Sequence, residues 1–241
     1  MRFLALLCVG AVLWGQTTFQ EQAQRLMNIQ SYLLDLRPAT APEIVDHFQI
    51  EAILDLYPQP DVNARIGNKE EALDPPSWVP KLRFRGFFRN GLMIGGAWAP
   101  GIDFQDYRAE FIALELGYRR VFQSWTTSVR ASYSDGEIEG AITDPDFEDL
   151  FQYKNSGLDI SVGHYFGRAH VYGFVGWNET DNQLDIALDG VHLEGDDGTY
   201  YGGLGVQIPW NRWRFNLEQN ATDTYLRNLI LSASYRFGRK P

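Results

Sequence analysis

The chain has 241 residues, of which 44% are hydrophobic and 14% aromatic, and its formal net charge at pH 7 is −10. This negative charge argues against general nucleic-acid binding, which depends on Lys and Arg side chains that neutralise phosphates. After the N-terminus no segment approaches 18 consecutive apolar residues, so the sequence excludes a bundle of transmembrane helices.

The N-terminus has the features of a secretory signal. Arg2 precedes an apolar run from Phe3 to Trp14, which is too short to span a bilayer comfortably. We expect residues 1–15 to direct export across the inner membrane and to be removed after Gly15. The single cysteine, Cys8, lies in this segment, so the mature chain would hold no disulfide, and a secreted protein of this kind is typical of bacteria. Residues 16–47 are predicted to form an N-terminal periplasmic extension.

From residue 48 onward the hydrophobic period is two, which indicates β-strands with one apolar and one polar face. Residues 81–85 show it clearly, because Leu82 and Phe84 alternate with three cationic side chains. Strands are predicted at 48–57, 79–88, 92–99, 109–121, 125–138, 152–165, 169–178, 199–209, 213–221 and 225–237. The first of these is equally compatible with a helix. Ten strands is the favoured count; it becomes eight if a doubtful strand is dropped, and twelve if a separate hairpin closes at Asp189–Gly190.

The predicted connections alternate between short and long. Short turns are expected at 89–91, 122–124, 166–168 and 210–212. Longer polar connections are expected at 100–108, 135–149 and 179–199. Transmembrane β-barrels show this alternation, with tight periplasmic turns at one end and longer external loops at the other.

Strand length and aromatic placement agree with a membrane barrel. The predicted strands are close to the about 9–11 residues with which a tilted strand crosses a bilayer. Aromatic side chains fall near the predicted strand ends, where barrels carry interface girdles. The predicted interface aromatics are Trp98, Tyr118, Trp125, Tyr133, Trp177, Trp213, Tyr225 and Phe237.

The final strand, with alternating apolar residues that end at Phe237, resembles the assembly signal of bacterial outer-membrane β-barrel proteins. The resemblance covers residues 48–237 and is one of class, with no particular family assigned. It implies an all-β, antiparallel up-and-down transmembrane barrel of the cell envelope over residues 48–241. It also implies an outer-membrane location, with membrane lipids and the barrel-assembly machinery as partners.

If the polar faces point inward, the lumen is charged and rich in cations. The predicted lumen charges are Lys81, Arg83, Arg85, Glu115, Arg119, Arg130, Asp159, Arg214, Glu218 and Arg236. Two interpretations follow: a lumen filled by salt-bridged side chains, which makes the barrel structural, or a narrow porin-like pore that passes small anions. Small residues on the inner faces favour some open volume, namely Gly95, Ala97, Gly163, Gly203 and Gly205.

Two alternatives come from other classes. A periplasmic lipocalin-like binder of a hydrophobic ligand would place the apolar faces inside the barrel. An outer-membrane lipid-modifying enzyme would need a Ser–His pair, but Ser161 and His164 are three positions apart and would face opposite sides of a strand. We therefore expect no enzyme activity, no catalytic residues, and no cofactor or metal motif. Divalent cations are predicted partners of the acidic external segments 135–139, 144–149 and 193–197.

Overall fold

The computed structural model describes residues 19–34, 45–58, 78–104, 107–143, 146–188, 190–222 and 227–238. These residues form one helix, α2 (Phe19–Leu34), and ten strands. The strands are β1 (Gln49–Pro58), β2 (Trp78–Phe87), β3 (Leu92–Phe104), β4 (Tyr107–Phe122), β5 (Trp125–Gly140), β6 (Asp149–Phe166), β7 (Ala169–Ile186), β8 (Val191–Trp210), β9 (Trp213–Thr222) and β10 (Arg227–Phe237). The predicted signal segment and Tyr225 lie outside the described residues.

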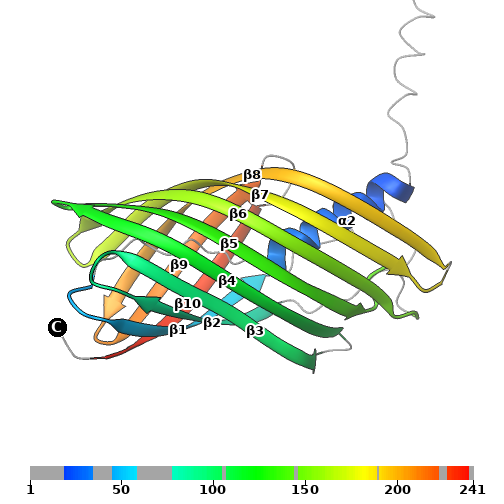
Figure 1. The fold of residues 1–241 in the computed structure, drawn as a ribbon, viewed down its shortest axis with the longest axis horizontal. Coiled ribbons are helices and arrows are strands. Elements are labelled where there is room, and N and C mark those ends of the chain that lie inside the picture. The colour runs from blue at the N-terminus through cyan, green and yellow to red at the C-terminus, as the bar shows by residue number, and fades with distance from the viewer. Residues whose placement is uncertain are drawn as a thin grey trace, which may run out of the picture.

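The ten strands close into one antiparallel barrel (Figure 1). Each strand pairs with its neighbours in sequence, and β1 pairs with β10, from Ile50 opposite Phe237 to Leu56 opposite Leu231. The predicted ten-stranded barrel is confirmed. The count of twelve is wrong, because β7 and β8 pair without interruption from His170 opposite Gln207 to Ile186 opposite Val191, so this hairpin is the end of their ladder and adds no strands.

The exterior of the barrel is apolar and the interior is polar. Side chains alternate along each strand, so that Leu114 of β4 is 58% exposed while its neighbour Glu115 is 3% exposed. This orientation overturns the lipocalin-like alternative, which needs its apolar faces inside. An apolar exterior around a polar interior is the arrangement of outer-membrane barrels, in which the outer band faces lipid.

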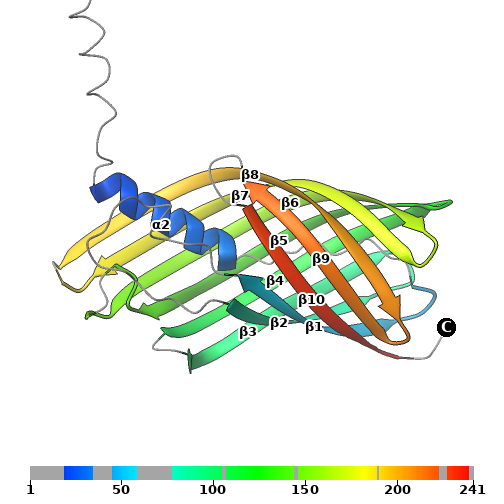
Figure 2. The same cartoon turned by 180° about the vertical axis from the view of Figure 1, so that it is seen from behind.

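The two ends of the barrel differ. At one end, the short-turn end, tight turns join β2 to β3, β4 to β5, β6 to β7 and β8 to β9, and β1 begins and β10 ends there. At the other end, β4 to β8 continue beyond the apolar band as a sheet on one side of the barrel (Figures 1 and 2). We call this sheet the wall; it comprises residues 107–111, 135–140, 149–157, 178–186 and 191–199.

The wall corrects the prediction of long connections. Most of the segments 100–108, 135–149 and 179–199 are strand: β5 runs to Gly140, β7 to Ile186, and β8 begins at Val191. The sequence predicted loops here because polar residues occupy the outward positions of these strands, which lie beyond the apolar band. Without an apolar face, a strand in water lacks the alternation that a strand in lipid shows.

The ladder between β2 and β3 is short. It covers only Arg83–Phe87, whereas β2 continues to pair with β1 back to Trp78. Pro80 on β2 and Pro100 on β3 have no amide hydrogen to donate, and β3 carries an irregularity between Pro100 and Ile102. Among the described residues, β3 beyond Ala97 therefore pairs with β4 alone.

Helix α2 lies inside this arrangement, against the inner face of the wall (Figure 2). It contacts β6, β7 and β8, and its buried Leu26 and Met27 pack with Phe151 and Leu184 in one apolar cluster. Among the residues that the structure describes, no helix is long and apolar enough to cross a membrane.

Candidate functional site: an ion-pair layer across the lumen

Inward-facing charges on neighbouring strands meet across the middle of the barrel. β2 contributes alternate cationic residues, and the carboxylates that receive them come from β1 and β4. Arg83 binds Asp55 through two hydrogen bonds, from Nε to Oδ2 at 2.5 Å and from Nη2 to Oδ1 at 3.0 Å. Both side chains are fully buried. A paired fork of this kind is the geometry in which Arg and carboxylate bind most strongly.

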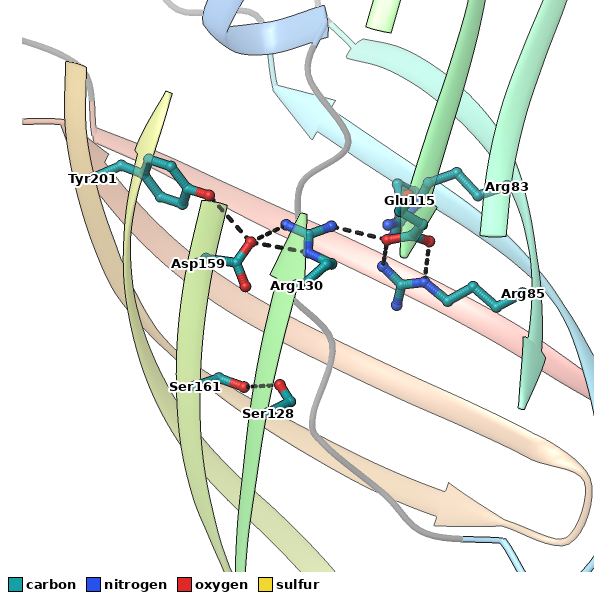
Figure 3. A network of polar contacts seen from close by, with 9 residues as sticks. Arg83, Arg85, Glu115, Ser128, Arg130, Asp159, Ser161 and Tyr201 are labelled. Carbon is teal, nitrogen blue, oxygen red and sulfur yellow. Dashed lines mark hydrogen bonds and ion pairs between the residues drawn. The ribbon is translucent and has the colours of Figure 1, made fainter. Parts of the chain in front are cut away.

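Glu115 joins two arginines. Arg85 donates from Nε to Oε1 and from Nη2 to Oε2, the second at 2.8 Å, and Arg130 donates from Nη1 to Oε2 at 3.0 Å. The three side chains come from β2, β4 and β5, so Glu115 links three strands through its carboxylate (Figure 3).

The chain of contacts continues to the opposite part of the barrel. Arg130 donates from Nε and Nη2 to Asp159 Oδ2 at 2.9 and 2.6 Å, and Tyr201 donates its hydroxyl to the same oxygen at 3.1 Å. Arg85, Glu115, Arg130, Asp159 and Tyr201 therefore form one connected network from β2 to β8, which we call the ion-pair layer (Figure 3). Within it each charged side chain has an opposite charge as its partner, as burial in a low-dielectric interior demands.

The inner glycines make room for larger side chains. A Cβ at Gly95 would collide with Glu115 and with the Arg85 side chain, and one at Gly205 would collide with the Tyr172 ring. Beside Arg130 and Asp159 lies a cavity of about 10 Å³, about enough for one water molecule. At these glycines the expectation of open volume is therefore wrong, because larger neighbours fill the space.

The other predicted lumen charges lie apart from the ion-pair layer. Lys81 lies over the rings of Tyr57 and Phe111. At the short-turn end, Arg119 and Arg236 both lie over the Phe87 ring, at 4.1 and 5.3 Å from its centroid.

Arg214 and Glu218 lie on β9, away from the layer. Arg214 is partly exposed and donates to the carbonyl oxygen of Trp213 at 3.0 Å. Glu218 is buried, accepts from the Tyr172 hydroxyl at 2.5 Å and from Asn220 at 3.3 Å, and has neutral partners in these bonds.

Two buried carboxylates were missed by sequence reasoning. Asp55 pairs with Arg83, and Glu51 accepts from Ser234 and lies 3.7 Å from Arg236. Both belong to β1, whose alternation placed them on one face but was equally compatible with a helix. Among the described residues, five cations and six carboxylates are at most 4% exposed, and the sixth carboxylate, Asp149, lies at the start of β6 in the wall. Arg214 and Arg236 add two partly buried cations toward the short-turn end, so the most deeply buried charges are close to balanced. The ten within the barrel are Glu51, Asp55, Lys81, Arg83, Arg85, Glu115, Arg119, Arg130, Asp159 and Glu218.

The predicted interface aromatics are on the exterior of the barrel. Trp98, Tyr133 and Trp177 are exposed on the wall side of the apolar band. Tyr118, Trp125, Trp213 and Phe237 are exposed toward the short-turn end. Each group thus follows one edge of the band, which is where membrane barrels carry their aromatic girdles.

Ser161 and His164 face opposite sides of β6, as predicted, and the Ser–His hydrogen bond at the short-turn rim joins His164 to Ser124 instead. Ser161 faces the lumen and bonds to Ser128 at 2.6 Å, whereas His164 faces outward and its Nε2 lies 2.9 Å from Ser124 Oγ. Nδ1 of His164 is buried without a hydrogen-bond partner among the described residues. A catalytic triad needs a third group that accepts a hydrogen bond from the histidine and orients it, and no described residue does this for His164 Nδ1.

The outward face of the wall is acidic. Glu110, Glu137, Asp181 and Asp196 are exposed there and line a hollow of about 1130 Å³. Two pairs of like charges face each other directly across strands, Glu110 with Glu137 and Asp181 with Asp196. In the described part of the chain no group of three or more metal-binding side chains gathers. Divalent cations as partners of this face remain a prediction.

His192 lies near the tip of the wall between two carboxylates. Its Nδ1 is 2.5 Å from Asp185 Oδ1, and its Nε2 is 3.2 Å from Glu194 Oε1. These hydrogen bonds, the one to Asp185 foremost, raise the pKa of His192 above its ordinary value of 6.5.

No protein-family model and no curated protein matches the chain. Similar solved structures include the attachment invasion locus protein Ail of Yersinia pestis, with 13% identity, 79% of this chain and 96% of that chain covered, and a TM-score of 0.34. Neisserial surface protein A shows 10% identity, coverage of 78% and 95%, and a TM-score of 0.35. The Ralstonia pickettii toluene transporter TbuX shows 10% identity, coverage of 84% and 92%, and a TM-score of 0.34.

With TM-scores this low, these likenesses carry no argument about the function of this chain. The fold class rests on the closed ladder and the apolar exterior of this chain.

Proposed function

We propose that the protein is a structural outer-membrane barrel with a closed lumen, which anchors the wall at the cell surface. The ion-pair layer carries this proposal, because it links paired charges across the lumen from β2 to β8, and the cavity beside Arg130 and Asp159 holds only about 10 Å³. In this orientation the short turns lie in the periplasm and the wall lies outside, as in barrels with short periplasmic turns.

A narrow anion pore is the second candidate, and the structure offers less support for it. Selective passage of anions needs a lining with excess positive charge along an open path. In the described lumen, five buried carboxylates accompany five buried cations, and Arg83, Arg85 and Arg130 are each hydrogen-bonded to a carboxylate. A filled interior is also what barrels with few strands usually have.

Membrane fractionation combined with heat-modifiability on a semi-native gel tests the proposal. We expect the protein in the outer-membrane fraction, with an unheated band that migrates faster than the heated one. Purified protein in planar bilayers should then give no single-channel conductance. Steady conductance that prefers anions would replace the structural role with the pore, and recovery in the soluble periplasmic fraction would reject the membrane barrel.

A further inference from the structure

Polar contacts hold α2 on the inner face of the wall. Asn28 donates from Nδ2 to Asp197 Oδ2 at 2.6 Å, and Asn155 donates to the backbone carbonyl of Ser31 at 2.8 Å. Asp197 and Asn155 are inward residues of β8 and β6, so α2 bridges separate strands of the wall.

Apolar contacts complete the interface. Leu26 and Met27 are 2% and 1% exposed and belong to the cluster that includes Phe111, Phe151 and Leu184. The inner face of the wall is therefore a groove with an apolar floor and polar edges, and α2 supplies an amphipathic helix that matches it.

The position of α2 is unexpected for a segment that precedes β1. Val45 is buried against Phe87 and Met93 at the short-turn end, close to the start of β1. The helix lies at the wall end, with its Leu34 end toward the middle of the barrel and its Phe19 end pointing away from it (Figures 1 and 2). The described helix and Val45 therefore lie toward opposite ends of the barrel.

Two features of the interface favour reversible binding. Asn182 contacts Asn28 and Ser31 of α2 at 3.4 Å through its amide nitrogen, and its side-chain oxygen is buried without a hydrogen-bond partner among the described residues. Unsatisfied buried polar atoms weaken an interface. A helix of 16 residues is also marginally stable on its own, so α2 depends on its contacts with the wall.

We propose that the inner face of the wall is a binding groove for an amphipathic helix, that α2 occupies it as an intramolecular ligand, and that the amino end of α2 faces the cell exterior. Release of α2 uncovers Phe151, Leu184 and Ile186. It proceeds toward the exterior, because the ion-pair layer closes the lumen behind the helix. This orientation rests on the proposed function, and it replaces the periplasmic extension predicted from the sequence for residues 16–47.

Cysteine labelling on intact cells tests the orientation. Cys8 is the only cysteine in the sequence, so a Cys8→Ser background accepts single reporters. The reporters are Arg25→Cys on the exposed side of α2, Asp181→Cys on the outer face of the wall, and Arg168→Cys in a short turn. With a membrane-impermeant maleimide we expect the first two to react on intact cells, and the third only after permeabilisation.

The three reporters separate the two proposals. Labelling of Asp181→Cys but not Arg25→Cys on intact cells would overturn the placement of α2 and leave the barrel orientation standing. Absence of labelling at Asp181→Cys on intact cells would overturn the orientation itself, and with it the proposed function.

Labelling rates test whether α2 occupies its groove reversibly. Met27→Cys should react far more slowly than Arg25→Cys, because Met27 is buried against the wall. Asp197→Ala removes the acceptor for Asn28 and should raise the Met27→Cys rate roughly tenfold. Asp196→Ala, the neighbour that faces outward, is the matched control and should leave the rate unchanged.

Either of two results would overturn the proposal that α2 binds this groove. One is equal rates at positions 27 and 25 in the otherwise native chain. The other is an equal effect of Asp196→Ala and Asp197→Ala while heat-modifiability shows that both barrels are closed. Asp197→Asn, which keeps an acceptor oxygen, should give an intermediate rate and guards against loss of folding in the alanine variant.

Discussion

At the scale of single residues, Glu115 has the most demanding environment in the barrel. Its carboxylate is buried and receives hydrogen bonds from both Arg85 and Arg130. Neither arginine can lose its charge, so the network holds only while the carboxylate compensates both. The side chain therefore acts as a joint between β2, β4 and β5.

Glu115→Gln should strongly destabilise the barrel. The amide leaves two buried arginines without full compensation, and breaking a buried ion pair by removing one partner costs about 3–5 kcal/mol. Urea unfolding in lipid vesicles measures the loss. Glu137→Gln is the control, because Glu137 is exposed on β5 and accepts one bond from Gln152. Its effect should stay within about 0.5 kcal/mol. Equal stabilities would show that Glu115 is not such a joint.

His192 offers a prediction about pH in the wall. Its pKa is raised by Asp185 and then Glu194, so the imidazolium persists to a higher pH in the folded protein than in the unfolded chain. The associated stabilisation is complete below the ordinary value of 6.5 and is lost as the pH rises through the raised pKa. Asp185→Asn should lower the pKa of His192, as followed by NMR of the ring protons. Asp181→Asn, on the same outward face, should not, and a shift of equal size in both variants would contradict the assignment.

At the scale of elements, one strand crosses two environments. The outward residues of β4 change from Leu114 and Ile112 within the apolar band to Glu110 and Arg108 in the wall. The strand geometry does not change at this boundary, since pairing with β5 continues from Phe122 to Arg108 without interruption. The solvent that the outer face meets therefore sets the residue type at each position.

An arginine should be tolerated on β4 at position 110, in the wall, but not at position 114, in the apolar band. Leu114→Arg places a charge on the lipid-facing side and should destabilise the barrel by about 2–4 kcal/mol if that position lies near the bilayer midplane. Glu110→Arg, on the same face of the same strand, should have a small effect because water surrounds it. Urea titrations in vesicles compare the two, and similar losses would place the boundary of the band elsewhere.

At the scale of the whole molecule, the barrel closes twice. The β1–β10 ladder closes the ring of strands, and the ion-pair layer links side chains across its interior. The first closure separates the polar interior from lipid, and under the proposed function the second blocks the passage of solutes. Helix α2 then covers the apolar part of the inner wall at the mouth.

Removing the centre of the ion-pair layer should open the lumen. The quadruple variant Arg85→Ala, Glu115→Ala, Arg130→Ala and Asp159→Ala deletes two cations and two carboxylates together, so no charge of the ion-pair layer is left without its partner. We expect measurable conductance in planar bilayers, in contrast to the native barrel. The double variant Ser128→Ala and Ser161→Ala, which removes a nearby hydroxyl pair, is the control (Figure 3). If neither variant conducts, another part of the chain closes the lumen.

The sequence by itself determined which face of each membrane-spanning strand is apolar, and therefore the ten-stranded barrel and its short turns. The alternation of apolar and polar residues is enough for this, because side chains on a strand point to opposite faces in turn, whichever strands lie beside it. Arg83, Arg85 and Arg130 could be assigned to one face in this way. Glu51 and Asp55 could not, since the alternation of residues 48–57 did not exclude a helix.

Only the tertiary structure decided which of these charges meet. A shift of two residues in the register between strands keeps every side chain on its face but changes its partner, so Glu115 as the acceptor for both Arg85 and Arg130 follows from closure of the barrel. The wall and the location of α2 also needed the structure. Their strands lack an apolar outer face, and the contact of Asn28 with Asp197 joins residues that are distant in sequence. Periodicity records the environment of each face, whereas pairing across strands depends on how the whole chain closes.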